Sequence, residues 1–182
     1  MVIIFPTDTV YGIGTKIFDL EGINKIYGIK KRPKDKPLAC LCASLDQIKS
    51  IAILNDDAEK LINAFLPGPL TLILKSKDEV KEKIGYETIG VRIPNYKLAL
   101  DILKENGPML TTSVNESGSN PINEYEDILV KYGKCVDEIY KSNEKSSALA
   151  STVVLMTTDS FKILREGEIT LNMIKNILNK KG

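Results

Sequence analysis

Side chains that could bind or activate a small molecule follow several apolar, strand-like runs in this sequence. The hydroxyls and carboxylate of PTDT (6–9) come directly after VIIF, Ser113 and Asn115 end the run MLTTSVN, and Ser151 opens STVV. Arg165 follows a further short run, KIL. Hydroxyl, amide and guanidinium groups recognise substrates through directed hydrogen bonds. We expect these strand ends to line one shared cleft, although each alone is equally compatible with an ordinary turn after a strand.

Arg92 is a charged residue inside the otherwise apolar stretch TIGVRIP (88–94). A buried arginine is costly unless a carboxylate pairs with it. We therefore expect Arg92 to meet a carboxylate, and the sequence leaves open whether the protein or a ligand supplies it.

The segment IKKRPKDKPL (29–38) places five basic residues close together: Lys30, Lys31, Arg32, Lys34 and Lys36. Such a cluster suits phosphate, because Arg offers a planar fork of donors and Lys a compact point charge. The alternative is a solvated surface run. Neither GxxxxGK[ST] nor GxGxxG occurs in the chain, so a nucleotide would have to bind without those loops.

The composition, 43% hydrophobic and 27% charged with a net charge of +1, is that of a soluble globular protein. The 182 residues favour a single domain, 1–182. Neither a membrane-length apolar run nor a basic leader is visible, so we expect a cytoplasmic protein.

The absence of histidine excludes the usual zinc sites and Ser-His-Asp or Cys-His catalysis. The three cysteines are expected to be small core residues.

The elements that must position these groups follow from hydrophobic periodicity and capping signals. Strands are expected at 2–4, 38–43, 70–75, 88–93 and 109–113, with a hairpin of 151–156 and 161–164 turned at 157–159. Helices are expected from Asp19 to about 31, over 45–51, after Asp56, and over 96–106, 124–132 and 171–178. The charged segment 76–83 is expected to be a mobile connection, and 141–147 a hinge or lid. Because no strict β-α-β rhythm is present, we expect a mixed α/β sheet surrounded by helices.

Seven of these stretches, in this order, resemble the YrdC family of threonylcarbamoyl-AMP synthases. The matching stretches are PTDTVYGIG (6–14), KKRPKDKPL (30–38), FLPGPLTLIL (65–74), TIGVRIP (88–94), TSVNESG (112–118), STVV (151–154) and LREGEIT (164–170). They span nearly the whole chain, and together they are far more specific than any one of them. The chain resembles the short, single-domain form of the family.

The resemblance implies a twisted mixed parallel and antiparallel sheet around a large, positively charged cavity. It implies that L-threonine, bicarbonate and ATP give threonylcarbamoyl-AMP and pyrophosphate, for N6-threonylcarbamoyladenosine modification of tRNA next to the anticodon. A separate transferase complex would complete that modification, with direct tRNA contact left open and no membrane involved. Mg²⁺ would be held mainly by ATP, with no protein side chain as a metal ligand.

The resemblance also implies roles for individual residues. For catalysis these are the KxR and SxN pairs, Lys30, Arg32, Ser113 and Asn115. For L-threonine they are Thr9, Lys36, Arg92, Ser113 and Ser151. For ATP they are Lys30, Arg32, Thr88, Asn115, Asn123 and Arg165.

The chain departs from the family pattern at a few positions. Lys31 fills the middle of KxR, where a small residue is common, and Val114 replaces the usual alanine. The segment before STVV lacks the family's usual glycine, Leu155 stands where an acidic residue is common, and the chain begins at the first strand. These departures affect the expected loop geometry near Ser151 and the expected catalytic rate.

Two other functions compete with the enzyme. A non-catalytic RNA- or tRNA-binding module could keep the same basic cavity, but the sequence has no RNP aromatic pair, GXXG clamp or excess of basic charge. A carbamoyl-transfer domain of a larger enzyme is the other, because the family fold also occurs in hydrogenase-maturation proteins. The zinc-finger-like cysteines and acylphosphatase-like segment of those proteins are absent from this sequence.

Overall fold

The computed structural model of the protein describes residues 1–142, 147, 149–158 and 160–179. Within them, ten strands form one sheet: β1 (Ile3–Phe5), β2 (Gly12–Lys16), β3 (Ala39–Leu41), β4 (Ala52–Ile53), β5 (Leu70–Ser76), β6 (Thr88–Arg92), β7 (Met109–Ser113), β8 (Glu138–Ile139), β9 (Thr152–Leu155) and β10 (Lys162–Arg165). The helices are α1 (Leu20–Lys30), α2 (Leu45–Ile51), α3 (Asp56–Phe65), α4 (Asp78–Ile84), α5 (Lys97–Asn106), α6 (Tyr125–Tyr132) and α7 (Leu171–Leu178).

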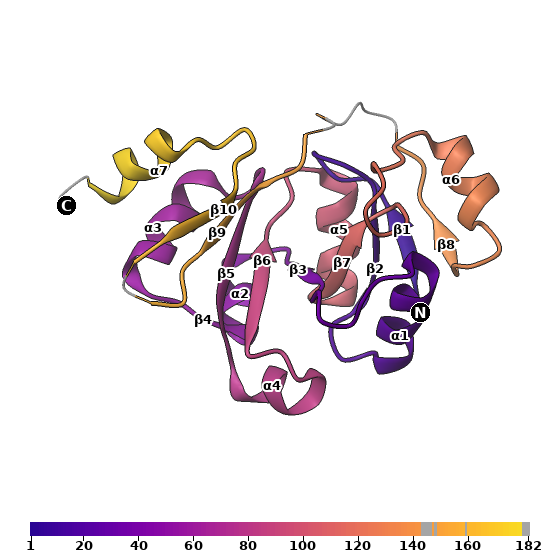
Figure 1. Cartoon of the computed structure of the whole chain (residues 1–182), viewed down its shortest axis with the longest axis horizontal. Coiled ribbons are helices and arrows are strands. Elements are labelled where there is room, and N and C mark those ends of the chain that lie inside the picture. Colours follow the sequence, from indigo (N-terminus) through magenta and orange to yellow (C-terminus); the bar gives the residue numbers. More distant parts are fainter. Residues whose placement is uncertain (143–146, 148, 159, 180–182) are drawn as a thin grey trace.

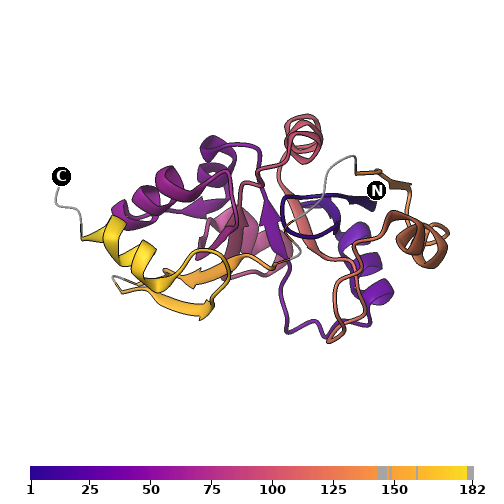
Figure 2. The same cartoon turned by 90° about the horizontal axis from the view of Figure 1, so that it is seen from above.

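The sheet runs in the order β10-β9-β5-β6-β3-β7-β2-β1-β8, and β4 pairs with β5 outside this path. Three neighbouring pairs are parallel, namely β1–β8, β3–β6 and β5–β9, and the others are antiparallel. The expected mixed sheet surrounded by helices is therefore confirmed. Figure 1 shows α3 and α7 beside β9 and β10, with α1 and α6 at the opposite end of the sheet, and Figure 2 shows the same separation from above.

The hydrophobic core is divided into two clusters. The larger contains the inward-facing leucines of β5 together with buried residues of α1, α2 and α3. The smaller lies under α5 and joins Ala99, Ile102 and Leu103 to Phe5 of β1 and Met109 of β7. The ends of β1 and β7 are therefore held by packing against α5.

Most expected elements are confirmed, and the differences have physical causes. Most of the segment expected to be mobile, 76–83, belongs to helix α4, whose Val80 is 1% exposed and which is followed by Gly85 with a φ of 72°. The cap of α3 is Asn55 rather than Asp56, because the Asn55 side chain accepts the N–H of Ala58 at 2.8 Å. Cys40 and Cys42 are buried as expected, but Cys135 is exposed, so that prediction was wrong for one cysteine.

The stretch after β1 contains a strand that the sequence did not predict. The loop covers only Pro6–Tyr11, since Gly12 and Gly14 belong to β2, which returns antiparallel to β1. Of the segment 141–147 that we expected as a hinge or lid, 143–146 lie outside the described residues, as does Asp159 of the expected hairpin turn. In the described part of the chain, no helix is both long enough and apolar enough to cross a membrane.

Candidate functional site

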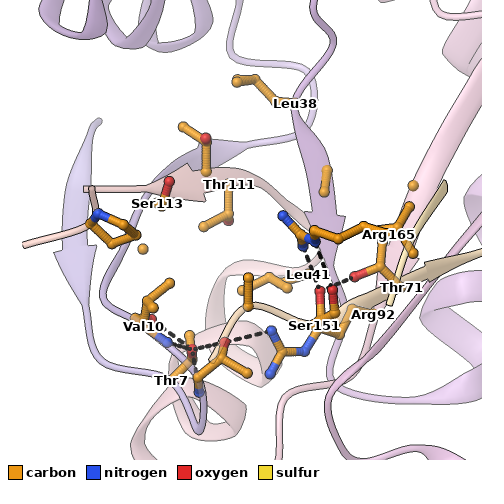
Figure 3. A pocket seen from close by; sticks show the side chains of 18 of the residues that line it. Thr7, Val10, Leu38, Leu41, Thr71, Arg92, Thr111, Ser113, Ser151 and Arg165 are labelled. Carbon is orange, nitrogen blue, oxygen red and sulfur yellow. Dashed lines mark hydrogen bonds between the residues drawn. The ribbon is translucent and has the colours of Figure 1, made fainter. Parts of the chain in front are cut away.

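A cavity of about 470 Å³ opens on one face of the central strands (Figure 3). Successive side chains of a strand point to opposite faces of a sheet. In β5, Leu70 and Leu72 pack into the larger core, whereas Thr71 and Ile73 line the cavity. The strand sequence LTLIL thus places a polar residue at the site through the same alternation that builds the core.

Seven of the residues singled out in the sequence line this cavity. They are Thr9, Arg32, Thr88, Arg92, Ser113, Ser151 and Arg165. They come from the β1–β2 loop, the basic segment and strands β6, β7 and β10, with Ser151 directly before β9. The expectation that these strand ends meet in one cleft is therefore confirmed.

Arg92 lies at the buried end of β6 and is 6% exposed. Its Nη2 donates to Oδ1 of Asp8 at 2.6 Å, Nη1 to Oγ1 of Thr9 at 2.7 Å and Nε to the Gly68 carbonyl at 3.0 Å. Burial lowers the pKa of Arg92, while the nearby Asp8 carboxylate opposes that shift. The carboxylate that the sequence required thus comes from the protein, through a pair that is itself largely buried.

Among the described residues, these contacts use three of the five guanidinium N–H groups of Arg92 and leave one on each terminal nitrogen. Arg92 lines the cavity even though it pairs with Asp8. Its two remaining N–H groups are the kind of donors that bind the two oxygens of a carboxylate.

Ser151 is held from two sides on the same wall of the cavity. Its Oγ lies 2.8 Å from Oγ1 of Thr71 and accepts from Nη2 of Arg165 at 3.3 Å. The Nε of Arg165 donates to the Ser151 carbonyl at 2.9 Å. Figure 3 shows Thr71, Arg92, Ser151 and Arg165 gathered on one side, across from Thr111 and Ser113.

The two guanidinium groups on this wall affect each other. Burial first, and then repulsion from Arg92, lower the pKa of Arg165. Two neighbouring cations that repel each other are stabilised when an anion binds near both. This arrangement therefore favours an anionic ligand.

The opposite wall depends on the two glycines of β2. Gly14 pairs with Thr111 of β7, and Gly12 pairs with Ser113. A Cβ on either glycine would lie 2.7 Å from the Thr111 side chain, so a larger residue would displace it. The glycines thus make room for the methyl and hydroxyl groups of Thr111.

Lys31 ends α1 in a left-handed conformation, with a φ of 49°. The chain reverses there, which leaves Lys30 pointing inward and brings Arg32 to the cavity. Arg32 is oriented by two carbonyls of its own segment: Nε donates to Lys36 at 2.8 Å and Nη2 to Pro37 at 3.0 Å. The basic segment thus presents a guanidinium group whose direction is fixed by backbone.

Lys30 and Asn115 do not line the cavity but lie behind its wall. The Lys30 ammonium, in a residue 2% exposed, donates to the carbonyl of Ser113, to the carbonyl of Asn115 at 2.9 Å and to Oδ1 of Asn115 at 2.8 Å. All three of its N–H groups are used. Burial, followed by repulsion from Arg32, lowers its pKa to about 8. In this structure Lys30 fixes the exit of β7, where Ser113 Oγ also donates to Oδ1 of Asn115 at 2.7 Å.

Two further residues of the expected site also lie outside the cavity lining. Lys36 is exposed, and it is its carbonyl that holds Arg32. Asn123 accepts the backbone N–H of Tyr11 at 3.1 Å and so fixes the end of the β1–β2 loop. The structure therefore brings seven of the eleven expected residues to the cavity and places Lys30, Lys36, Asn115 and Asn123 in its supporting wall.

Sequence reasoning did not identify Thr71 or the role of Asp8 as partner of Arg92. Thr71 could have been found as the polar member of the alternating strand LTLIL. The Asp8–Arg92 pair joins positions 84 residues apart and has no local sequence signal.

Comparison with known proteins identifies relatives of nearly the whole chain. The family model Sua5_yciO_yrdC, described as "Telomere recombination", matches residues 1–167. A putative threonylcarbamoyl-AMP synthase from Methanocaldococcus jannaschii is 32% identical over 173 residues, covering 95% of this chain and 83% of that protein.

Two solved structures are similar in fold and sequence. The crystal structure of Pyrococcus abyssi Sua5 complexed with L-threonine has a TM-score of 0.90 and 31% identity, covering 98% of this chain and 54% of that one. The chain therefore spans about half the length of that relative. The crystal structure of Escherichia coli YciO has a TM-score of 0.83 and 31% identity, covering 92% of this chain and 83% of that one.

Proposed function

Since the chain belongs to the Sua5/YciO/YrdC family, we propose that it is an L-threonylcarbamoyladenylate synthase of the nucleotidyltransferase type. It would act as one domain, condensing L-threonine, bicarbonate and ATP into threonylcarbamoyl-AMP and pyrophosphate. Two relatives support this proposal: the M. jannaschii protein named as a putative synthase and the P. abyssi structure complexed with L-threonine.

The observation that carries the proposal is the pair of guanidinium groups on one wall of the cavity. Arg92, with two N–H groups unused among its described contacts, would bind the threonine carboxylate beside Thr9 and Ser151. Arg165 and Arg32 would bind the phosphates of ATP, and Thr88 lies with them in the lining. Lys30 and Asn115 would act through Ser113, which they hold, rather than by touching a ligand.

The reaction would proceed in two steps. The threonine amine attacks bicarbonate, a C–N bond forms and water leaves, which gives a carbamate. A carbamate oxygen then attacks the α-phosphorus of ATP, a P–O bond forms and the bond to the β-phosphate breaks. Both steps bring anions together, and fixed guanidinium groups stabilise the developing charge without reorganising.

No histidine is present to act as general base. Asp8 is a carboxylate at the proposed amino-acid end, but its Oδ1 lies 2.6 Å from Arg92. We propose that Asp8 is the counter-ion of Arg92 and that the threonine amine loses its proton on binding.

Mg²⁺ would enter with ATP, bound to the departing pyrophosphate. In the residues that the structure describes, no group of three or more His, Cys, Asp or Glu side chains is arranged to hold a metal ion. The product would serve N6-threonylcarbamoyladenosine formation on tRNA through a separate transferase complex.

The proposal is tested by incubating the protein with Mg·ATP, L-threonine and bicarbonate and detecting the adenylate by mass spectrometry. We expect the product and pyrophosphate only when all three substrates are present. Arg92→Ala, which removes the proposed carboxylate donor, is expected to abolish both. No product from the wild-type protein, together with tight binding of unmodified tRNA, would instead favour the RNA-binding module.

A further inference from the structure

Two tyrosines, which do not line the cavity of the candidate site, contact each other behind the basic segment. Tyr27 belongs to α1 and is 7% exposed, and Tyr86 precedes β6. Their hydroxyl oxygens are 2.9 Å apart. The Tyr27 hydroxyl also donates to the Lys36 carbonyl at 3.0 Å, and the Leu38 N–H donates to the Tyr86 oxygen at 3.1 Å.

The end groups of this chain of hydrogen bonds determine the direction of every proton in it. A carbonyl can only accept and a backbone N–H can only donate. Tyr27 must therefore give its proton to Lys36, so the bond between the two hydroxyls is donated by Tyr86. Burial raises the pKa of Tyr27, so that its proton is retained at neutral pH.

This chain of hydrogen bonds begins and ends in the segment 36–38, which also orients Arg32. The Lys36 carbonyl that accepts from Tyr27 also accepts from Nε of Arg32 at 2.8 Å, and the next carbonyl, that of Pro37, accepts from its Nη2 at 3.0 Å. Leu38, which is 2% exposed, leads into β3. The tyrosines thus fix both sides of Pro37, which has no N–H of its own to fix it.

The tyrosines do not face the proposed ligands. They line a second cavity, of about 490 Å³, on the other side of the basic segment. Pro37 and Thr88 line both cavities. A change in either tyrosine can therefore reach the first cavity through the 36–38 backbone, which holds Arg32, and a change in Tyr86 also through Thr88.

We propose that Tyr27 and Tyr86 are positioning residues that hold the 36–38 backbone so that Arg32 points at the phosphates of ATP. The inference rests on the proposed function, since ATP is the ligand that Arg32 would bind. Neither tyrosine touches the reacting atoms. Their removal should weaken nucleotide binding while leaving the amino-acid end of the cavity unchanged.

The test compares Tyr86→Phe with Tyr132→Phe, because the Tyr132 hydroxyl is buried without a hydrogen-bond partner in the described part of the chain. Titration calorimetry with Mg·ATP should show the dissociation constant of Tyr86→Phe raised about fivefold, the usual effect of losing one neutral hydrogen bond. The control should match the wild type, and L-threonine affinity should be unchanged in both. In an Arg32→Ala background, Tyr86→Phe should cause no further loss.

A folded Tyr86→Phe variant that binds Mg·ATP as tightly as the wild type would overturn the inference while leaving the proposed function intact. An equal loss with and without Arg32 would also overturn it, since a merely structural role predicts that result. Failure of the wild type to bind Mg·ATP would count against the proposed function instead. Hydrogen exchange at the Leu38 amide then decides whether the pair holds the segment: we expect faster exchange in Tyr86→Phe, and unchanged protection would contradict it.

Discussion

Replacing Asp8 by asparagine removes the negative charge beside Arg92 while keeping the size of the side chain. The carboxylate Oδ1 lies 2.6 Å from Nη2 of Arg92, and the two side chains are 16% and 7% exposed. Breaking a buried ion pair by removing one partner costs about 3–5 kcal/mol, because the other charge stays buried. The asparagine side chain would still offer an amide oxygen, and Asp8 is partly solvated, so we expect a loss of about 2 kcal/mol in the free energy of unfolding.

For a chain of this length, that loss corresponds to a Tm lower by about 4–8 °C. Thermal denaturation followed by circular dichroism measures it. Asp101→Asn is the matched control, because it removes a carboxylate whose partners, Lys97 and Lys104, are largely solvated on the surface of α5. We expect that control to leave Tm unchanged.

The same variant tests the proposed role of Asp8 in the reaction. If Asp8 is only the counter-ion of Arg92, Asp8→Asn should retain turnover within about tenfold, measured at a temperature well below its Tm. Turnover lost entirely, with Mg·ATP and L-threonine still bound, would identify Asp8 as the general base and refute our reasoning. An unchanged Tm would show that the ion pair does not stabilise the protein as its burial implies.

Three further predictions follow from the site. Arg165→Ala should raise the dissociation constant of Mg·ATP about 10- to 100-fold, the usual effect of losing charged hydrogen bonds. L-threonine should lose less affinity, because Arg165 only holds Ser151 at that end of the cavity. Equal losses for both ligands in calorimetry would contradict the assignment of Arg165 to the nucleotide. The pKa of Lys30 is lowered to about 8 from 10.5, so the unfolded chain binds more protons than the folded one between these pH values. The free energy of unfolding of the wild type minus that of Lys30→Met, measured by urea denaturation, should therefore rise with pH across that window. A difference that falls with pH would contradict the burial of the Lys30 charge. Lys31 has a φ of 49°, a left-handed conformation that is strained for lysine but not for glycine. Lys31→Gly should relieve roughly 1 kcal/mol of strain and raise Tm by about 2–4 °C. A lower Tm would show that the Lys31 side chain stabilises the turn by more than its backbone strain costs.

The parts of the fold that the sequence predicted are those with strong local signals. The run LTLIL marks β5, and the helix expected over 45–51 is α2, which Ser44 caps by accepting the N–H of Gln47 at 3.2 Å. The segment containing α4 was misread because Val80 is its one buried residue, so the apolar stripe of a helix is missing. Its ends instead follow from acidic residues in the first turn and Gly85 after the last.

No strand was predicted at β2, because glycine is unfavourable in strands. Gly12 and Gly14 are tolerated there because the Thr111 side chain of β7 occupies the space above them, which is a contact between residues about 100 positions apart. Such pairings are invisible to local patterns.

In the candidate site, too, local patterns predicted some features, and contacts between distant residues determined the others. Strand alternation predicts that Thr88 and Arg92 share a face, and both line the cavity. The basic segment predicted cations near a ligand but not their directions. Because Lys31 reverses the chain, Arg32 reaches the cavity while Lys30, two residues earlier, is buried behind β7.

The central claim is that one cavity binds both the amino acid and the nucleotide. A crystal structure of the protein with threonylcarbamoyl-AMP tests it most directly. We predict the threonyl carboxylate within hydrogen-bond distance of Arg92 and the adenylate phosphate within hydrogen-bond distance of Arg165. Ligand bound instead in the second cavity between α1 and the loop before β6, or with its two ends reversed, would contradict the claim.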